Sequence, residues 1–502
     1  MKRKGAIDLL LVTPGGRMTV YQALGSTLCA IEPPVWAGLI ATYVRRHGFG
    51  VAILDANAED LSPEEVADRV ADVDPLLTAV VVYGHNPSAS TQVMPAAGAI
   101  CRAIKVMQPD RNTLLLGGHV AALPVRTLQE ESADFVCDGE GPVTVVELLS
   151  ALAESGPDLR RVRGLRYREG PGIRTNEPAP LVEKLDTEMP GIAWDLLPME
   201  RYRAHNWHCF GGFPRQPYAA IYTTLGCPHH CSFCCIHAPF KRGERVLGYK
   251  ESVNSYRRWN PQSVIATIDR LVSDYGVRNI KFADELFVLD PSHVSGICDL
   301  IIGRGYDLNI WAYARVDTLP DVLLDKLARA GIRWLALGIE SASQRVRSDA
   351  VKGFAQDNIL RAVEGIRARG INIGANYIFG LPEDDNESME TTLRLALELN
   401  TEWANFNCAM AYPGSQLYST ALEGKWSLPF DWSGYSQYAS NTVPLPTRHL
   451  SGADVLRFRD QAFQTYFSNS AYQERILRKF GEDTLSHVRG LVRHKIERGI
   501  LR

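Results

Sequence analysis

The sequence has no apolar run that approaches the roughly 20 residues of a membrane-spanning helix. Its start, MKRKGAIDLLLVTPGG, holds an apolar run of only about six residues and no small-residue cleavage site, which indicates a first strand and not a secretory signal. Charge of one sign forms no long block, and Lys+Arg 54 against Asp+Glu 57 leaves a net charge of -3. We therefore expect no membrane span, no nucleic-acid partner, a cytoplasmic location and a small-molecule substrate.

Disulfide bonds are not expected either, because the ten cysteines come without any secretion signal and thiols stay reduced in the cytosol. A close-set group of cysteines in such a protein indicates a metal site or catalysis. The chain has 502 residues, 45% of them hydrophobic, which is enough for two or three domains with their own cores.

The first part of the chain, residues 1–152, alternates short Leu- or Val-rich runs with helical stretches. Five runs predict strands, namely DLLLVTP, VAILDAN, TAVVVYGH, TLLLGGH and DFVCDGEG. Strands separated by helices are typical of an α/β fold with a doubly wound parallel sheet. Ligands of such sheets bind at the carboxyl ends of the strands.

Residues 153–215 are rich in Gly and Pro and predict a linker that contains one hairpin. Residues 216–412 then show six further strand and helix alternations, which predict a partial (β/α)6 version of the TIM barrel. Residues 413–502 are aromatic and helical, and we expect a mostly helical C-terminal domain there.

Three cysteines, Cys227, Cys231 and Cys234, follow the first barrel strand in the run TTLGCPHHCSFCCIH. A C-x3-C-x2-C loop can hold three corners of a cubane iron-sulfur cluster and leave the fourth iron free to bind another molecule. Zinc is the alternative, with nearby histidines as further ligands, but the second short-spaced ligand pair of a structural zinc site is missing.

The segment CPHHCSFC, with Phe233 before its last cysteine, resembles the signature of the radical S-adenosylmethionine (SAM) enzymes. The resemblance implies a 4Fe-4S cluster on Cys227, Cys231 and Cys234. It further implies that the open iron binds SAM and that one-electron reduction cleaves SAM to a 5'-deoxyadenosyl radical. An external one-electron reductant of the flavodoxin or ferredoxin type is then needed.

The later strand ends, KFADELF, AYARVDTL, LALGIES and NYIFGLPED, resemble those of the branch that includes methylthiotransferases and cobalamin-dependent enzymes. The resemblance assigns SAM contacts to Phe233, Asp284, Glu285, Arg315, Glu340, Ile378 and Gly380. It places Asp284 and Glu285 near the methionine amino group, and Arg315 and Glu340 near the carboxylate or ribose. It places Phe233, Ile378 and Gly380 beside the adenine. Each acid taken alone could equally be a helix cap or a solvated charge. The family's common GGE triplet is replaced here by ADE.

The N-terminal domain resembles the cobalamin-binding domain of cobalamin-dependent radical SAM enzymes. The cobalamin contacts that we predict are Pro14, Ser88, Ser90, Gly117, Gly118, His119, Gly139, Glu140 and Gly141. Gly and Ser are also common in ordinary loops between strands and helices. The loop TPGGRMTV lacks the Asp-x-His-x-x-Gly motif that supplies a cobalt ligand in many such domains, and His85 and His119 lie on other loops. We expect cobalt without a protein histidine beneath it.

Together these resemblances imply a cobalamin-dependent radical SAM methyltransferase that methylates an unactivated carbon of a small molecule, with methylcobalamin as methyl donor. No protein acid or base is singled out as catalytic. A cobalamin-dependent radical SAM cyclase or rearrangement enzyme has the same domain order and remains an alternative.

Two further alternatives are a methylthiotransferase and a cobalamin- or light-sensing protein. A methylthiotransferase needs a second cluster, for which Cys29, Cys101 and Cys137 give the right count, but Cys101 falls in a predicted helix and Cys137 in a predicted strand. A sensor needs a DNA-binding or signalling module, and none is visible in the sequence.

Overall fold

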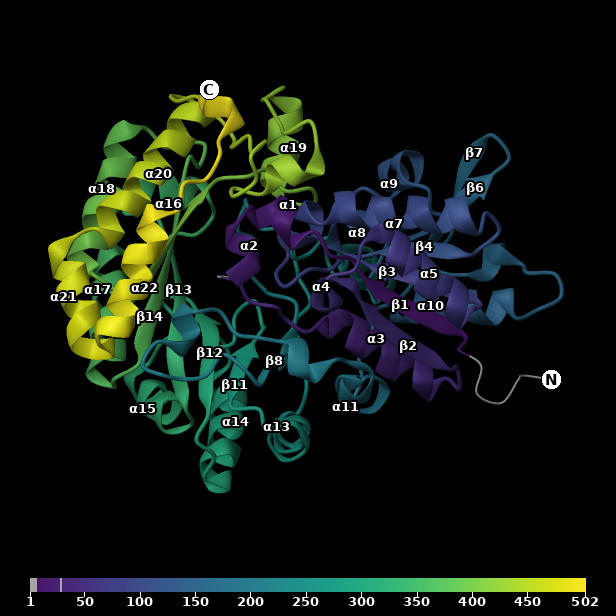
Figure 1. The fold of residues 1–502 in the computed structure, drawn as a ribbon, viewed down its shortest axis with the longest axis horizontal. Coiled ribbons are helices and arrows are strands. Elements are labelled where there is room, and N and C mark those ends of the chain that lie inside the picture. The colour runs from purple at the N-terminus through teal and green to yellow at the C-terminus, as the bar shows by residue number, and fades with distance from the viewer. Residues whose placement is uncertain (1–6, 28) are drawn as a thin grey trace.

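The computed structural model describes residues 7–27 and 29–502, and it contains two α/β domains that lie side by side (Figure 1). The first is built on a sheet of seven strands and the second on a sheet of six. The α/β fold class, with parallel sheets and a mostly helical C-terminal region, is confirmed.

The first sheet has the strand order β2-β1-β3-β4-β5-β6-β7. Its parallel strands are the five that the sequence predicts: β1 (Leu9–Thr13), β2 (Val51–Asp55), β3 (Leu77–Val81), β4 (Thr113–Leu116) and β5 (Phe135–Cys137). Strand order reverses between β1 and β3, which is where doubly wound sheets bind ligands.

Helices cover both faces of this sheet, which explains why its strands are apolar throughout. Leu9 and Leu11 of β1 face the core formed with α3 (Val35–Arg46) and α10 (Pro142–Leu152). Leu10 and Val12 face the other core, formed with α5 (Pro63–Val73) and α7 (Met94–Met107). Shorter helices at the strand ends are α1 (Arg17–Tyr21), α2 (Leu24–Thr27), α4 (Ala56–Glu59), α6 (Ala89–Gln92), α8 (Gly118–Ala122) and α9 (Pro124–Glu130).

The hairpin that the sequence places in the linker belongs to the first sheet. β6 (Leu165–Glu169) pairs antiparallel with β5, and β7 (Gly172–Thr175) pairs antiparallel with β6. Without β6 the β5 strand would be an open sheet edge, so the hairpin covers an edge that could otherwise pair with another chain. The sequence pattern shows a hairpin but not the sheet to which it adds.

The second sheet is entirely parallel and has the order β15-β14-β13-β12-β11-β8, as expected for a partial barrel. Its strands are β8 (Tyr218–Ile221), β11 (Asn279–Phe282), β12 (Asn309–Ala314), β13 (Ile332–Glu340), β14 (Asn372–Phe379) and β15 (Trp403–Cys408). The helices between them are α13 (Pro261–Tyr275), α14 (Pro291–Arg304), α15 (Asp321–Arg329), α16 (Gln344–Asp349), α17 (Gln356–Ala368) and α18 (Asn386–Leu399).

The C-terminal region consists of α19 (Gln416–Glu423), α20 (Gly452–Phe467), α21 (Ser470–Phe480) and α22 (Glu482–Arg493). In Figure 1 the helices α20 to α22, coloured yellow, lie beside β14 and α18 on the side of the barrel away from the first domain. Tyr466 of α20 is fully buried and packs edge-on against Phe406 of β15, with 5.5 Å between the ring centres. The region therefore covers the last strand of the open barrel.

Buried ion pairs join the two domains. Arg257 of β10 (Arg257–Arg258) contacts both carboxylate oxygens of Glu140 at 2.7 and 3.1 Å. Lys281 of β11 is 1% exposed and donates to Glu32 at 2.8 Å and to the backbone oxygen of His85 at 2.9 Å. These partners lie on opposite sides of the domain boundary, so the pairs fix how the strand ends of one domain face the other.

Candidate active site

A cavity of about 1120 Å³ lies between the two domains at the carboxyl ends of the barrel strands. The first domain contributes Tyr21, His85, Ser88 and Gln92 to its wall. The barrel contributes Phe233 and Cys234 of the cysteine loop, Glu285 from the turn after β11, and the strand residues Tyr313, Asn376, Ile378 and Asn407. The C-terminal region contributes the end of α22 and the segment after it. It is large enough to hold parts of two cofactors and a small molecule, since drug-sized ligands occupy about 300–1,000 Å³.

The cysteine loop begins directly after β9 (Thr224–Leu225), and short-range contacts fix its path. Gly226 has φ +89°, and a Cβ there would lie 2.3 Å from the backbone oxygen of Ser255, so only glycine fits. Further along, Ser232 N donates to Ala350 O at 3.2 Å and Ser232 O accepts from Leu417 N at 2.8 Å. The loop is therefore held by two parts of the barrel domain and by α19 of the C-terminal region.

The three thiols fit an iron-sulfur cluster by their chemistry. Cys227, Cys231 and Cys234 are all free and half-buried. Burial raises the pKa of each thiol, to about 11 for Cys227, and the charge of Cys231 acts on both of the others. A bound metal would remove this penalty by holding them as thiolates. Within residues 7–27 and 29–502 no three His, Cys, Asp or Glu side chains converge on a single ion.

Two of the three histidines near the loop, His230 and His237, have ring contacts to other residues. His237 Nε2 lies 2.9 Å from the backbone oxygen of His229 and 2.9 Å from Asn254 Nδ2. Asn254 Nδ2 also lies 3.3 Å from His230 Nδ1. Asn254 thus contacts the rings of His230 and His237, whereas the buried Nε2 of His229 has no hydrogen-bond partner among the described residues.

The two acids after β11 have different surroundings. Asp284 is fully buried and accepts hydrogen bonds from Thr223 N, Thr223 Oγ1 and Thr224 Oγ1, while burial raises its pKa to about 6. Glu285 lines the cavity, has no hydrogen bond to any described residue, and its pKa is raised by burial to about 8. Asp284 is thus occupied in joining β8 and β9 to β11, whereas Glu285 is available to a ligand.

Arg315 lies at the end of β12, and its guanidinium makes two parallel bonds of 3.0 Å to Asp317. The side chain is only 11% exposed. Burial works against the charge of Asp317, but the guanidinium outweighs it and lowers the pKa of that carboxyl. The same guanidinium charge acts on Cys227 and Cys231.

Glu340 ends β13 with φ +63°, a conformation that is strained for any residue other than glycine. Its carboxylate accepts a hydrogen bond from the ammonium of Lys352, which lies 6.0 Å from the ring centre of Phe233. A Cβ on Gly338 would lie 2.4 Å from Lys352 Nζ and 2.7 Å from Glu340 Oε1, so the absent side chain makes room for the pair. Strained backbone of this kind is concentrated at functional sites.

Phe233 and Ile378 pack against one small apolar cluster formed by Val346, Ala350, Leu381 and Ala409. This places two of the three predicted adenine contacts on one wall. Gly380 has φ +82°, and a Cβ there would lie 2.5 Å from Val455 Cγ1 of α20. Packing against α20 is therefore sufficient to explain the glycine.

The inner face of β14 and β15 carries amides. Asn405 Nδ2 donates to Asn376 Oδ1 at 2.9 Å, and Gln437 Nε2 donates to Asn407 Oδ1 at 2.5 Å. Tyr377, next along the strand from Asn376, lies on the opposite face, is fully buried and stacks on Phe406 at 5.4 Å. Strand alternation thus puts Asn376 and Ile378 in the cavity and Tyr377 in the core.

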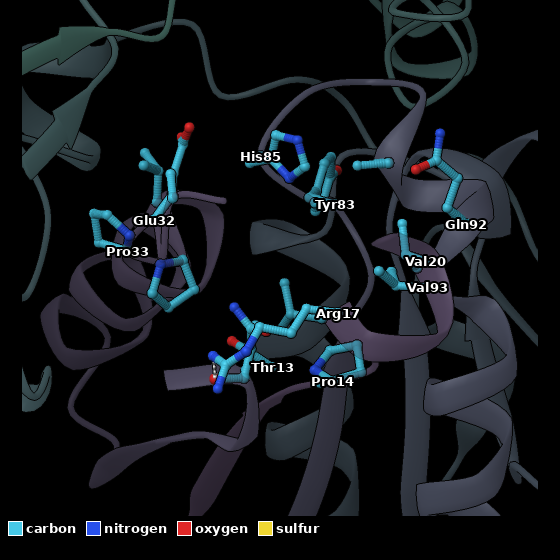
Figure 2. Close-up of a pocket in the computed structure, with 18 of the residues that line it drawn as sticks. Thr13, Pro14, Arg17, Val20, Glu32, Pro33, Tyr83, His85, Gln92 and Val93 are labelled. Carbon is cyan, nitrogen blue, oxygen red and sulfur yellow. Dashed lines mark hydrogen bonds between the residues drawn. The ribbon is translucent and has the colours of Figure 1, made fainter. Parts of the chain in front are cut away.

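On the side of the first domain, a smaller cavity of about 100 Å³ opens at the ends of β1 and β3, where strand order reverses. Pro14 lines this small cavity, as do Thr13, Tyr83 and His85. Figure 2 shows Glu32 and Pro33 facing Gln92 and Val93 across the small cavity. Several of these residues also line the large cavity, so a ligand of the switch point can reach the barrel.

The other predicted cobalamin contacts have varied surroundings. Ser90 Oγ donates to Val82 O and accepts from His119 N at 2.8 Å. Gly117 has φ +147°, and a Cβ there would lie 2.1 Å from Val82 O. His119 is buried against Trp432, with 4.4 Å between the ring centres, and burial lowers the pKa of His119 to about 3. Ser90, Gly117 and His119 therefore pack the ends of β3 and β4.

Of the remaining residues, Ser88 lines the large cavity and Gly118 borders a small pocket with Tyr222 and Glu285. Gly139 has open space where a Cβ would stand, Gly141 caps α10 with φ +115°, and Glu140 pairs with Arg257. All nine cobalamin contacts remain predictions, as do the SAM contacts.

No histidine of the loop after β1 reaches the small cavity, because the loop has none; Arg17 lines it and is tied to Asp60 at 2.9 Å. His85, from the loop after β3, lines both cavities with its Nε2 3.3 Å from Tyr21 Oη.

Sequence reasoning missed Lys352, Lys281 and Glu32. Lys281 lies in the middle of an apolar strand, which was a usable signal, because a buried lysine needs a partner. Its partner Glu32 is 249 residues away, and no local pattern connects them.

Comparison with known proteins identifies both domains. The family model of the radical SAM superfamily matches residues 221–396, and that of the B12 binding domain matches residues 21–149. An uncharacterized methyltransferase of Pyrococcus horikoshii, PH0819, is 27% identical over 99% of this chain and 98% of its own length. The anaerobic magnesium-protoporphyrin IX monomethyl ester cyclase of Rubrivivax gelatinosus is 27% identical over 79% of this chain and 68% of its own.

Among solved structures, the radical SAM methyltransferase TsrM of Kitasatospora setae, with tryptophan and a SAM analogue bound, superimposes with a TM-score of 0.64. The identity is 18%, over 96% of this chain and 97% of that one, so the similarity concerns the fold.

The chain therefore contains a B12 binding domain followed by a radical SAM domain, as the sequence resemblances predict. The radical SAM domain implies a 4Fe-4S cluster and SAM, the B12 binding domain implies cobalamin, and chemistry of this kind requires an electron donor. No helix in the described parts of the chain is both long and apolar enough to cross a membrane.

Proposed function

We propose that the protein is a methyltransferase that transfers a methyl group to an unactivated carbon of a small molecule. The observation that carries the proposal is the single cavity bordered by the cysteine loop on one side and by the end of the cobalamin-type sheet on the other. When bound, the cofactors supply a 5'-deoxyadenosyl radical and a transferable methyl group. Both can then reach one substrate from opposite sides.

The protein's own residues bind, orient and exclude water. Phe233 and Ile378 offer an apolar wall for an adenine, Glu285 offers an unpaired carboxylate for an ammonium, and the amides of β14 and β15 form a polar wall. The segment after α22 closes the cavity on its outer side. Because hydrogen-atom and methyl transfer need little proton transfer, no protein acid or base is assigned.

An electron donor of the flavodoxin or ferredoxin type, present in the cytoplasm, would reduce the cluster. The half-buried cysteine loop is consistent with electron transfer from outside the chain.

The test uses anaerobically reconstituted protein with bound cobalamin, a strong reductant and SAM but no substrate. A methyltransferase is expected to form about one S-adenosylhomocysteine and one methylcobalamin per bound cobalamin, both measured by chromatography and mass spectrometry. Protein prepared without cobalamin is the control and should form neither. Formation of 5'-deoxyadenosine without S-adenosylhomocysteine or methylcobalamin would contradict methyl transfer.

That contrary outcome would favour the second candidate, a cobalamin-dependent radical SAM cyclase or rearrangement enzyme. The Rubrivivax gelatinosus cyclase is as identical to this chain as the Pyrococcus methyltransferase is, and this similarity supports the cyclase or rearrangement alternative. Domain order and cofactors are the same for both functions, so only the products distinguish them.

The methylthiotransferase alternative loses support. Cys101 is buried in the core on one face of the first sheet, and Cys137 is buried in the core on the other face. Because the sheet separates Cys101 from Cys137, these two cysteines cannot bind one second cluster together with Cys29.

A further inference from the structure

The segment that follows α22 forms a roof over the large cavity, and contacts to both domains hold it there. Arg498 makes two bonds to Asp460 of α20, at 2.9 and 2.8 Å, and a third to the backbone oxygen of Gln437. Gln22 of the first domain exchanges two hydrogen bonds with the backbone of Glu497, at 3.1 and 3.2 Å. We refer to residues 491–498, which are the end of α22 and the residues after it, as the roof segment.

The charges that line the cavity do not balance at the roof segment. Lys281 is paired with Glu32, and Arg459 is paired with Asp460 at 2.9 Å. Arg493 and Lys495 line the rim of the cavity, where both are exposed, and neither has an acidic partner in the described chain. Glu497 does not compensate them, because it pairs with Arg502 at 3.2 Å.

The remaining free acid, Glu285, belongs to the end of the cavity that faces the cysteine loop. Burial favours its neutral form, since its pKa is raised to about 8. The roof segment thus presents two positive charges to a cavity whose other charges are mostly paired.

The wall between these ends offers hydrogen-bond donors in excess. Asn407 uses its Oδ1 to accept from Gln437, which leaves its Nδ2 without a partner among the described residues. The hydroxyl of Tyr313 is likewise free of hydrogen bonds in the described chain. Donors left unsatisfied at a cavity wall favour a ligand rich in acceptor oxygens.

We propose that the substrate is a small molecule with an anionic oxygen group, a phosphoryl group or a carboxylate, which Arg493 and Lys495 of the roof segment bind. Arg493 suits two oxygens of either anion, and Lys495 adds a point charge. Asn407 and Tyr313 donate to further oxygens of the same molecule. The inference rests on the proposed function and names the substrate class for that cavity.

The test measures anion binding directly on the cobalamin- and cluster-loaded protein. The probes are inorganic phosphate, followed by ³¹P NMR line broadening, and ¹³C-acetate, followed in the same way by ¹³C NMR. The variants are Arg493→Gln with Lys495→Gln, and the control is Lys250→Gln, an exposed lysine that does not line the cavity.

Loss of each charged contact is expected to weaken binding by about tenfold, so the double variant should lose most of the broadening while Lys250→Gln keeps it. Broadening by phosphate alone indicates a phosphoryl substrate, and broadening by acetate as well shows that a carboxylate suffices. Equal broadening in the double variant and the wild type, or none for either anion, would overturn the inference. Wild-type protein that forms methylcobalamin but binds neither anion refutes only this inference, because the methylation assay contains no substrate.

Discussion

Lys352 and Glu340 form a buried ion pair beside the cysteine loop, in which the ammonium donates to Oε1 of the carboxylate. Their exposed fractions are 8% and 5%. The pair combines a strained backbone at Glu340, space left by Gly338, and proximity of the ammonium to Phe233. Such a costly arrangement at the end of a barrel strand indicates a role in holding a ligand at the cluster.

Removing one partner of this pair should lower the stability of the fold much more than removing both partners. Lys352→Met leaves the carboxylate of Glu340 buried without a partner, and we expect a loss of about 3–5 kcal/mol in the free energy of unfolding. The double variant Lys352→Met with Glu340→Gln should recover a good part of that loss. Chemical denaturation of the apo forms of the wild type, the two single variants Lys352→Met and Glu340→Gln, and the double variant measures these losses.

The matched control is Arg245→Met, which breaks an exposed pair with Glu251 at 2.9 Å and should cost no more than about 1 kcal/mol. Strictly additive effects of the two pair substitutions would show that Lys352 and Glu340 do not interact as described.

Stability should depend on pH through Glu285. Burial raises the pKa of its carboxyl from an ordinary value to about 8, so the folded state binds the proton more tightly than the unfolded state. The stability that this proton binding gives to the folded state is therefore fully present below the ordinary pKa of about 4.3 and is lost as pH rises toward 8. Glu285→Gln removes this dependence.

We expect the melting temperature of the wild type to fall relative to that of Glu285→Gln between pH 5 and pH 8, as measured by scanning calorimetry. A constant difference over that range would mean that Glu285 is solvated and has an ordinary pKa. Asp284 is unchanged in both proteins, so its own titration cancels in the comparison.

Two glycines of the first domain should respond differently to alanine. Gly117→Ala places a Cβ against the backbone oxygen of Val82 at an unfavourable φ, and we expect a loss of at least about 1–3 kcal/mol in stability. Gly139→Ala has open space and should change stability by less than about 0.5 kcal/mol.

Cobalamin titration of the same two variants tests the predicted contact at Gly139. We expect Gly139→Ala to weaken cobalamin binding although the fold is intact. An unchanged affinity would place the cofactor away from Gly139.

Periodicity and spacing predicted the five parallel strands of the first sheet, the six strands of the barrel and the place of the cysteine loop. These features depend on local patterns, such as the alternation that puts Leu9 and Leu11 on one face and Leu10 and Val12 on the other. The sheet to which the hairpin adds could not be predicted, because β6 pairs with a strand about 30 residues earlier, beyond the intervening helix α10, and no local pattern specifies that pairing.

The site could be predicted only in part for the same reason. The cysteines lie within eight residues of one another, so their spacing was visible in the sequence. The Lys352 and Glu340 pair depends on a turn after α16, and the Lys281 and Glu32 pair depends on how the domains dock. Strand alternation could not assign Tyr377 and Asn376 to a face until the core was known.

The account depends most on the cluster held by Cys227, Cys231 and Cys234, and electron paramagnetic resonance of the reduced, anaerobically reconstituted protein tests it directly. We expect about four irons per chain and a cubane signal that changes when SAM is added. The signal should disappear when all three cysteines are replaced by alanine. Absence of a cubane signal in the wild type, or its persistence in the triple variant, would contradict the account.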